Sequence, residues 1–516
     1  MLVKVYGAAV QGIDATLITI EVNCSRGIRF LLVGLPDASV KESHERIISA
    51  LEVNNLKFPR KQVVINMSPA DLRKEGSAYD LPLAIGILAA SESIKSDKLG
   101  NYVIMGELSL DGSILPIKGS LSIAIMAKEN GFKGLIIPKG NAKEAAVVEG
   151  LDVYGVSNIS EVVGLFNNIN NGEPNIQPTI VNLEEEFKNN RSSFELDFSD
   201  VKGQENVKRA LEVAAAGSHN IILVGPPGSG KSMMAKRMPT VLPPFTLDEA
   251  LETTKIHSVA GRADFNTSLM FMRPFRSPHH TISDVAMVGG GTSPQPGEIS
   301  LSHNGILFMD ELPEFNRSVL EVLRQPLEDR KITISRSRYN VNYPAGFMLV
   351  AAMNPCPCGY HNHPDKECVC SPGTVVKYLN KISGPLLDRI DIQIEIVPVP
   401  FDKISDRAPA EYSADIRERV VDARVIQEKR FRNIKGVYSN AQMTSKMVHR
   451  FASPDSAGLK LLKTAMERRC LSARAYDRIL KVSRTIADLD KSEEIKPIHL
   501  AEAINYRNLD SENWAY

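Results

Sequence analysis

Residues 225–232 constrain this chain most, because a glycine-rich stretch joins a short apolar run to a helical one. Residues 221–224 (IILV) predict a buried strand, and residues 233–238 (MMAKRM) predict a helix. The stretch fits the pattern G-x-x-x-x-G-K-[ST] with Gly225, Pro226, Pro227, Gly228, Ser229, Gly230, Lys231 and Ser232. Such a loop wraps phosphates in backbone N–H groups, while the lysine reaches the β- and γ-phosphates and the hydroxyl ligates Mg²⁺. An ordinary glycine turn is the alternative, and the strand-to-helix context disfavours it.

A second apolar run ends in two carboxylates. Residues 306–309 (ILFM) predict a buried strand that delivers Asp310 and Glu311 at its C-terminal edge, where ligands collect in parallel sheets. We expect Asp310 to hold the Mg²⁺ shell and Glu311 to polarise the attacking water. An acidic strand end is common by itself, but the upstream phosphate loop favours the functional interpretation.

Three further polar residues follow in an order that suits nucleotide chemistry. Asn354 comes after the apolar strand FMLVAAM and would position water or the γ-phosphate. Arg389 lies on a loop before a strand, where it would stabilise charge on a phosphoryl group. Arg474 opens a helix near the C-terminus, from which it would bridge a lid to the nucleotide. Taken alone, either arginine is more often a solvated or salt-bridged residue.

The order of these motifs resembles that of the AAA+ ATPases of the magnesium-chelatase-like group. The motifs are the phosphate loop, MDE at 309–311, AAMNP at 351–355, LLDRID at 386–391 and LSARAYDRI at 471–479. Residues 277–316 are especially similar to the ComM/YifB branch of that group, and the resemblance covers nearly the whole chain. It implies ATP and Mg²⁺ as cofactors. It also implies that Asn354 is sensor 1, that Arg474 is sensor 2, and that Arg389 is an arginine finger reaching the ATP of a neighbouring subunit in a homo-hexameric ring.

The 516 residues are long enough for about two or three domains. Residues 1–167 alternate strand-like and helix-like patterns and predict an α/β domain, whereas residues 168–196 are rich in Asn, Glu, Ser and Pro and predict a linker. Residues 197–400 predict the ATPase core, and residues 401–516 predict a helical lid. In the first domain we expect strands at 16–24, 30–35, 62–68, 102–110 and 134–140, with helices at 38–55 and 120–131.

The first domain resembles the Lon protease domain, which the same family carries. Residues 106–112 and 115–119 resemble the stretch before the catalytic lysine of Lon, and residues 135–139 resemble the strand after it. The Lon serine falls at Ala78 of this chain, and the Lon lysine falls at Leu121. A Ser/Lys protease needs a hydroxyl beside a desolvated amine, so we expect an inactive, non-proteolytic scaffold.

One alternative for the first domain stays open. Ser77 and Lys118 neighbour the two lost catalytic positions, so a shifted dyad is conceivable. The main expectation remains a domain that contacts substrate or organises the ring.

Composition restricts the partners and the compartment. Hydrophobic residues make up 43% of the chain, yet no apolar run has the length of a membrane span and the N-terminus lacks the layout of a signal peptide. We therefore expect a cytoplasmic protein. Lys+Arg and Asp+Glu both number 61, so DNA contacts would have to come from local basic patches.

Four of the six cysteines lie close together, at Cys356, Cys358, Cys368 and Cys370. Cys24 and Cys470 stand apart. In a cytosolic chain such clustering indicates a metal before it indicates disulfides, and four thiolates suit a closed tetrahedral Zn²⁺ site. His361 and His363, between the pairs, are alternative ligands, while a metal-free loop and an iron–sulfur cluster are the competing interpretations.

Residues 331–343 alternate apolar and polar side chains and predict a β-hairpin. In related AAA+ helicases such a hairpin points into the ring pore. Lys331, Arg336 and Arg338 would neutralise phosphates there, and Tyr339 would stack on a base. A solvated hairpin without a ligand is the alternative.

Three functions follow from these features. The first is a ring-shaped DNA motor, a branch-migration helicase in recombination or natural transformation. The second is a chelatase-type ATPase subunit that inserts a metal into a tetrapyrrole, although chelatase motors lack the Lon-like domain. The third is an ATP-dependent protease or unfoldase, which the missing Ser/Lys dyad disfavours.

Overall fold

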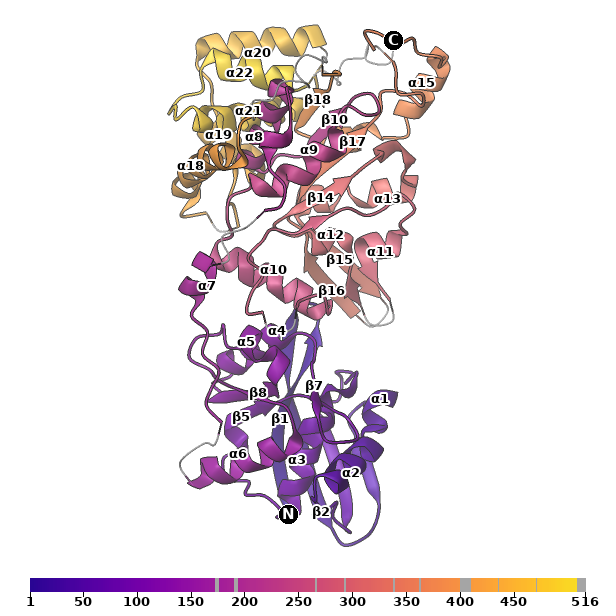
Figure 1. The fold of residues 1–516 in the computed structure, drawn as a ribbon, viewed down its shortest axis with the longest axis vertical. Coiled ribbons are helices and arrows are strands. Elements are labelled where there is room, and N and C mark those ends of the chain that lie inside the picture. Colours follow the sequence, from indigo (N-terminus) through magenta and orange to yellow (C-terminus); the bar gives the residue numbers. More distant parts are fainter. Residues whose placement is uncertain are drawn as a thin grey trace. The chain divides into compact units, whose positions relative to one another are not determined.

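The protein, seen in a computed structural model, forms two compact units (Figure 1). The first unit contains Met1–Asn190 and Leu247–Phe271, and the second contains Arg191–Thr246 and Met272–Tyr516. The structure describes residues 1–171, 176–189, 194–264, 267–291, 294–336, 339–361, 363–399, 410–434, 436–469 and 471–507.

The first unit is built on a seven-stranded mixed sheet with the order β3-β4-β2-β1-β5-β8-β9. Its strands are β1 Leu2–Gln11, β2 Asp14–Ser25, β3 Phe30–Val33, β4 Gln62–Ser68, β5 Tyr102–Ile104, β8 Gly134–Pro138 and β9 Asp152–Val156. A small ribbon joins β6 Glu107–Leu108 to β7 Ile114–Leu115. The helices are α1 Ala38–Lys41, α2 Ser43–Val53, α3 Asp80–Ala90, α4 Ser120–Glu129, α5 Ala142–Ala145, α6 Ile159–Asn171, α7 Leu183–Asn189 and α10 Leu247–Val259.

The α/β class expected for this part of the chain is confirmed, with differences in detail. The strand expected at 102–110 breaks after Ile104 and resumes as β6, and the helix expected at 38–55 is split between α1 and α2. The central strand β1 and the helix α3 were not anticipated. Every residue of α3 is buried, and because its sequence is apolar after Asp80 it shows no amphipathic period.

The segment 168–196, which the sequence predicts to be a linker, contains helical residues. Within 168–196, α6 continues to Asn171 and α7 forms a further helix. The chain also returns to the first unit after the phosphate loop, because α10 packs on α4. There the backbone N–H of Gly119 donates to Ser258 Oγ at 3.0 Å. Composition alone could not show that residues 247–271 leave the ATPase core.

The second unit has a five-stranded, wholly parallel sheet with the order β11-β14-β17-β10-β18. Its strands are β10 Ile221–Val224, β11 Phe275–Arg276, β14 Ile306–Met309, β17 Met348–Met353 and β18 Ile392–Glu395. Two antiparallel pairs accompany it, β12 Gly289–Gly290 with β13 Gln295–Pro296, and β15 Lys331–Arg336 with β16 Tyr339–Pro344. The helices are α8 Glu205–Gly217, α9 Lys231–Arg237, α11 Asp284–Val288, α12 Glu298–Leu301, α13 Arg317–Val322, α14 Pro326–Asp329, α15 Pro372–Leu379 and α16 Gly384–Leu387.

The C-terminal part is helical, as expected. It consists of α18 Ser413–Phe431, α19 Ser445–Phe451, α20 Ser456–Arg469, α21 Ala473–Leu489 and α22 Pro497–Asn505 (Figure 1). Val420 of α18 and Ile479 of α21 belong to the same buried cluster as Leu223 of β10. The lid and the sheet therefore share one core and form one compact unit. In the part of the chain that is described, no helix has the length and apolarity needed to cross a bilayer.

A buried ion network fastens α21 to the amino end of β18. The carboxylate of Asp391 is 1% exposed and lies 2.7 Å from Arg478 Nη1 and 3.3 Å from His219 Nδ1. Burial alone would raise the pKa of Asp391, but Arg478 and His219 hold it well below its usual range. The folded state therefore prefers the ionised carboxylate, and this contribution to stability is present above the unfolded-state pKa of about 3.9.

Arg478→Met should destabilise the second unit by about 3 kcal/mol, because it leaves Asp391 buried without its guanidinium. Urea unfolding at neutral pH measures the loss of stability. Arg468→Met, which changes an exposed side chain of α20, is the control, and it should change the free energy of unfolding by less than about 0.5 kcal/mol. The difference between Arg478→Met and the wild type should shrink as the pH falls and Asp391 becomes protonated. An equal loss of stability in both variants would contradict the assignment.

Candidate functional site

The phosphate loop follows β10 and leads into α9, as the motif predicts. Gly228 and Gly230 adopt φ values of 77° and 87°, which favour glycine. At Gly225 an added Cβ would lie 2.6 Å from the carbonyl oxygen of Ile396, so no side chain fits there. The loop is therefore held closely between β10 and the end of β18.

Lys231 occupies the mouth of this loop. Its Nζ donates to the carbonyl oxygens of Gly225 and Pro226, both at 2.8 Å, and lies 3.2 Å from Asn354 Oδ1. Burial lowers the pKa of Lys231, and the nearby carboxylates of Asp310 and Glu311 oppose this shift. The structure thus brings together residues that are far apart in the sequence.

Ser232 and Asp310 form the oxygen pair expected for Mg²⁺. Ser232 Oγ donates to Asp310 Oδ2 at 2.6 Å. The serine lies in the first turn of α9 and the aspartate directly follows β14, so both lie at the same carboxyl edge of the sheet. Hard oxygen ligands beside a phosphate loop fit Mg²⁺ bound to a nucleotide.

Glu311 follows Asp310 in a left-handed conformation, with φ of 52°, and its side chain is 60% exposed. Its backbone N–H donates to Asp310 Oδ1 at 3.0 Å. His280 Nδ1 lies 3.8 Å from Glu311 Oε2. This histidine follows β11, which pairs with β14, so both side chains leave the same sheet edge. Sequence reasoning assigns no role to His280, although a histidine in the loop that follows a parallel strand is a signal for a residue at the carboxyl edge.

Arg389 and Arg474 lie elsewhere. Asn220 Nδ2 donates to the carbonyl oxygen of Arg389 at 3.1 Å, and Asn220 directly precedes β10. Arg389 is therefore at the amino edge of the sheet, while the phosphate loop is at the carboxyl edge. Four residues of strand separate the two edges by about 13 Å.

The guanidinium groups at the amino edge are held by carboxylates. Arg389 pairs with Glu328 of α14 and donates to the carbonyl oxygen of Pro385 at 2.7 Å. Arg474 Nη1 lies 3.8 Å from Asp388 Oδ2. Helix α21 packs on α8 and at the amino end of β18, which keeps Arg474 beside Arg389 and away from the phosphate loop of its own chain. The role of Arg474 as sensor 2 stays a prediction.

The hairpin expected at 331–343 forms as β15 and β16, with Arg336 paired to Tyr339 at its last described rung. Arg338 lies outside the described residues, and so do the side chains of Arg336 and Tyr339. Lys331, one of the three cations expected to neutralise phosphates, pairs with Pro344 at the base of the hairpin. Five strand residues place it about 16 Å from Arg336 along the strand, so this lysine is far from the last described rung of the hairpin.

The two faces of the hairpin differ. Ile332, Ile334 and Tyr343 are buried, and Tyr343 donates its hydroxyl to the carbonyl oxygen of Pro294 at 2.7 Å. On the other face Thr333 donates to Asn342 at 2.7 Å and Ser335 donates to Asn340 at 3.1 Å. The hairpin therefore packs by one face and presents hydroxyl and amide groups on the other.

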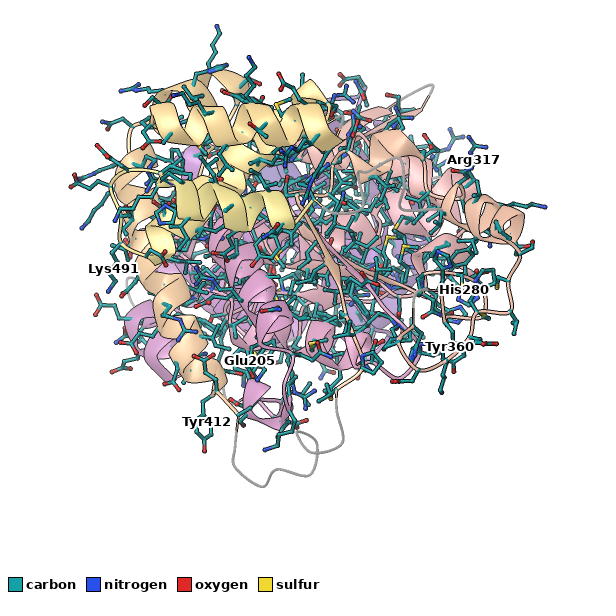
Figure 2. All side chains as sticks on the ribbon, turned by 90° about the horizontal axis from the view of Figure 1, so that it is seen from above. Glu205, His280, Arg317, Tyr360, Tyr412 and Lys491 are labelled. Carbon is teal, nitrogen blue, oxygen red and sulfur yellow. The ribbon has the colours of Figure 1, made fainter. Side chains whose placement is uncertain are left out.

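The four clustered cysteines converge in the loop between β17 and α15. The Sγ atoms of Cys356, Cys358, Cys368 and Cys370 all lie within 4.8 Å of one another. Neither His361 nor His363 joins this group, and His363 Nδ1 accepts the backbone N–H groups of Asp365 and Lys366. Figure 2 labels Tyr360 of this loop and His280 on the flank of the second unit opposite Lys491 and Tyr412.

Burial and local donors act in opposite directions on Cys358. Partial burial would raise its pKa, but backbone N–H groups of Tyr360 and Val369 and the neighbouring thiols lower it to about 6. One member of the cluster is thus readily ionised at neutral pH.

The Lon-like positions carry no dyad. Ala78 has no hydroxyl, and Leu121 is fully buried in α4, with its backbone N–H bonded to Glu144 Oε1 at 2.9 Å. The side chain of Lys118 packs against Gly261, where an added Cβ would lie 2.6 Å from Cε of the lysine. Among the described residues there is no hydrogen bond between Lys118 and Ser77, the pair named as a shifted dyad.

Comparison with known families covers most of the chain. Residues 197–404 match the magnesium chelatase subunit ChlI family, residues 410–507 match the ChlI C-terminal family, and residues 20–141 match a further ChlI subunit family of Mg-chelatase. Lon protease 2 of Bacillus subtilis is 29% identical over 157 residues, which are 28% of this chain and 27% of that protein.

Two relatives align along nearly the full length. Competence protein ComM of Haemophilus influenzae is 43% identical over 505 residues, covering 98% of this chain and 97% of ComM. YifB of Escherichia coli is 42% identical over 509 residues, which cover 98% of this chain and 97% of YifB. Together with the phosphate loop, the Ser232–Asp310 pair and the helical lid, these alignments show that the chain belongs to the ComM/YifB family of magnesium-chelatase-like AAA+ ATPases.

Proposed function

We propose that this protein is an ATP-hydrolysing DNA motor that works as a homo-hexameric ring and drives branch migration in recombination or natural transformation. The hydrolysis half of the proposal rests on the group of Lys231, Ser232, Asp310, Glu311 and Asn354. The DNA half rests on the hairpin and on the name of a relative, a competence protein.

The observation that carries the ring is the place of Arg389. A guanidinium at the amino edge of the sheet is about 13 Å from the phosphate loop of its own chain. An arginine that stabilises phosphoryl charge must approach the γ-phosphate directly. Arg389 therefore serves the ATP of a neighbouring copy, and Arg474, held beside it through Asp388, faces the same neighbour.

The hairpin supports DNA as the substrate. Its open face carries uncharged donors and acceptors from Thr333, Ser335 and Asn342, and the sequence of the segment adds arginines at 336 and 338. Polar side chains that contact sugar and phosphate, with a few cations, suit a strand held without sequence preference. A chain with zero net charge gains DNA affinity only where such cations are gathered.

The other two functions are less well supported. A protease would need a nucleophile and an amine, and Ala78 and Leu121 stand at those positions. A metal-inserting chelatase subunit shares all three family matches, but the two full-length relatives are named a competence protein and YifB and not a chelatase. The proposed cofactors are ATP with Mg²⁺, together with Zn²⁺ at the cysteine cluster, and work on DNA with ATP implies a cytoplasmic location.

Two substitutions separate binding from hydrolysis. Lys231→Ala should abolish ATP binding, because it removes the only side-chain cation described in the mouth of the loop. Glu311→Gln should bind ATP normally and lose hydrolysis by at least about 100-fold, since it removes the base that polarises water. A fluorescent ATP analogue and a phosphate-release assay measure the two effects. Normal turnover by either variant would refute the site assignment.

Mixed rings test the shared site. Lys231→Ala and Arg389→Ala should each be inactive alone, because every interface lacks one group. In an equal mixture, roughly a quarter of the interfaces should combine an intact phosphate loop with an intact arginine and regain activity. Phosphate release after co-assembly measures this rescue. If the mixture stays as inactive as its parts, Arg389 does not act across an interface.

The hairpin tip should govern DNA affinity. Arg336→Ala with Arg338→Ala should remove DNA stimulation of the ATPase and reduce the slope of log affinity against log salt by about 1.4 for single strands. Lys331→Ala, at the hairpin base, should have a smaller effect on both. Fluorescence anisotropy with single-stranded and branched DNA measures binding. No binding by the wild type at low salt would exclude the DNA motor.

A further inference from the structure

The cysteine cluster has the geometry of a closed metal site. Cys356 Sγ lies 3.3 Å from Cys358 Sγ and 3.7 Å from Cys368 Sγ, and the last two sulfurs are 3.6 Å apart. Four thiolates at about 2.3 Å from a tetrahedral Zn²⁺ would lie about 3.8 Å from one another. The three spacings are close to that value, and Cys370 Sγ lies within 4.8 Å of each of the other sulfurs.

The donors also match zinc in kind. All four cysteines are free thiols, Cys356 is fully buried, and the other three are half-buried. A set of four sulfur ligands closed to solvent is typical of structural zinc, whereas catalytic zinc keeps an open position. Backbone N–H groups of Tyr360 and Val369 donate to Cys358, as second-layer donors do around metal-bound thiolates.

The loop that carries these ligands lies directly against the phosphate loop. Between the two cysteine pairs, Gly359 turns the chain with φ of 84°, and its N–H donates to the carbonyl oxygen of Cys356 at 3.0 Å. A Cβ on Gly359 would lie 2.5 Å from Cδ of Pro227, in the middle of the phosphate loop. The turn formed by the first cysteine pair is therefore one wall of the phosphate loop.

Both ends of the cysteine loop also reach the ATP site. Asn354, which lies beside Lys231, precedes Cys356 by two residues at the end of β17. After Cys370, Ser371 caps α15, and Tyr378 of that helix accepts the backbone N–H of Asn354. A metal that joins the two cysteine pairs would thus fix Asn354, the Gly359 turn and α15 relative to one another.

We propose that Cys356, Cys358, Cys368 and Cys370 bind one Zn²⁺, and that this zinc braces the phosphate loop so that ATP affinity depends on metal occupancy. The proposal rests on the ATP-binding part of the proposed function and is independent of DNA and of branch migration. Zinc would form no bond to the nucleotide, and its effect would pass through the packing of Gly359 on Pro227.

Metal analysis of the full-length protein, prepared without oxygen, tests the site itself. We expect about one zinc per chain. The double variant Cys368→Ser/Cys370→Ser should lose the zinc, and Cys24→Ser, which changes a buried cysteine of the other unit, should keep it. Iron in place of zinc, or no metal in the wild type, would overturn the proposal.

Nucleotide titration tests the brace. With a fluorescent ATP analogue, the double cysteine variant and chelator-stripped wild type should bind at least about tenfold more weakly, and added Zn²⁺ should restore only the stripped wild type. Gly359→Ala should keep its zinc yet also bind ATP about tenfold more weakly, since its Cβ would press on Pro227.

The outcomes separate this proposal from the rest. Zinc loss with unchanged ATP affinity would disprove the brace, and so would full ATP affinity in Gly359→Ala. Loss of ATP binding in Cys24→Ser would show that the effect is general unfolding and would likewise count against it. A protein with zinc-dependent ATP affinity but no response to DNA would retain this proposal and lose the DNA motor.

Discussion

The parallel pairing of β10 with β17 and β18 is the constraint on which the rest of the second unit depends. In a parallel sheet all carboxyl ends meet at one edge and all amino ends at the other. The phosphate loop, Asp310 and Asn354 collect at the first edge. Arg389 lies at the second edge, on the side of the sheet opposite the phosphate loop of its own chain. In the proposed ring, a second copy would bring such groups together.

The buried network at the amino edge keeps this arrangement rigid. Asp391 binds Arg478 of the lid and His219 before β10, so the lid is fixed at the arginine side of the sheet. At the carboxyl edge, the Gly359 turn of the cysteine loop packs against Pro227 of the phosphate loop. Nucleotide binding and the presentation of Arg389 are therefore supported by separate sets of contacts, and substitutions in the two sets should affect different steps.

Much of this could be predicted from the sequence, because the motifs combine chemistry with a strand-to-helix context. Lys231, Ser232, Asp310 and Asn354 come together as expected. The place of Arg474 could not be predicted, since helical periodicity does not say against which edge of the sheet a helix packs. Likewise, the position of His280 beside Glu311 depends on the pairing of β11 with β14. These two strands are separated by about thirty residues of sequence, so local patterns do not show that they pair.

Local sequence patterns do not predict the structure where full burial removes the periodicity of a helix, or where long-range packing decides to which unit a segment belongs. Helix α3 is apolar on every side and gave no amphipathic signal, and the return of residues 247–271 to the first unit has no mark in composition.

The central claim is the proposal that the ATP site is shared between copies. The ATPase rate per chain, measured as a function of protein concentration, tests this proposal most directly. A shared site predicts that this rate falls on dilution as rings dissociate and recovers on reconcentration. A rate per chain that stays constant down to concentrations where the protein is monomeric would contradict the account.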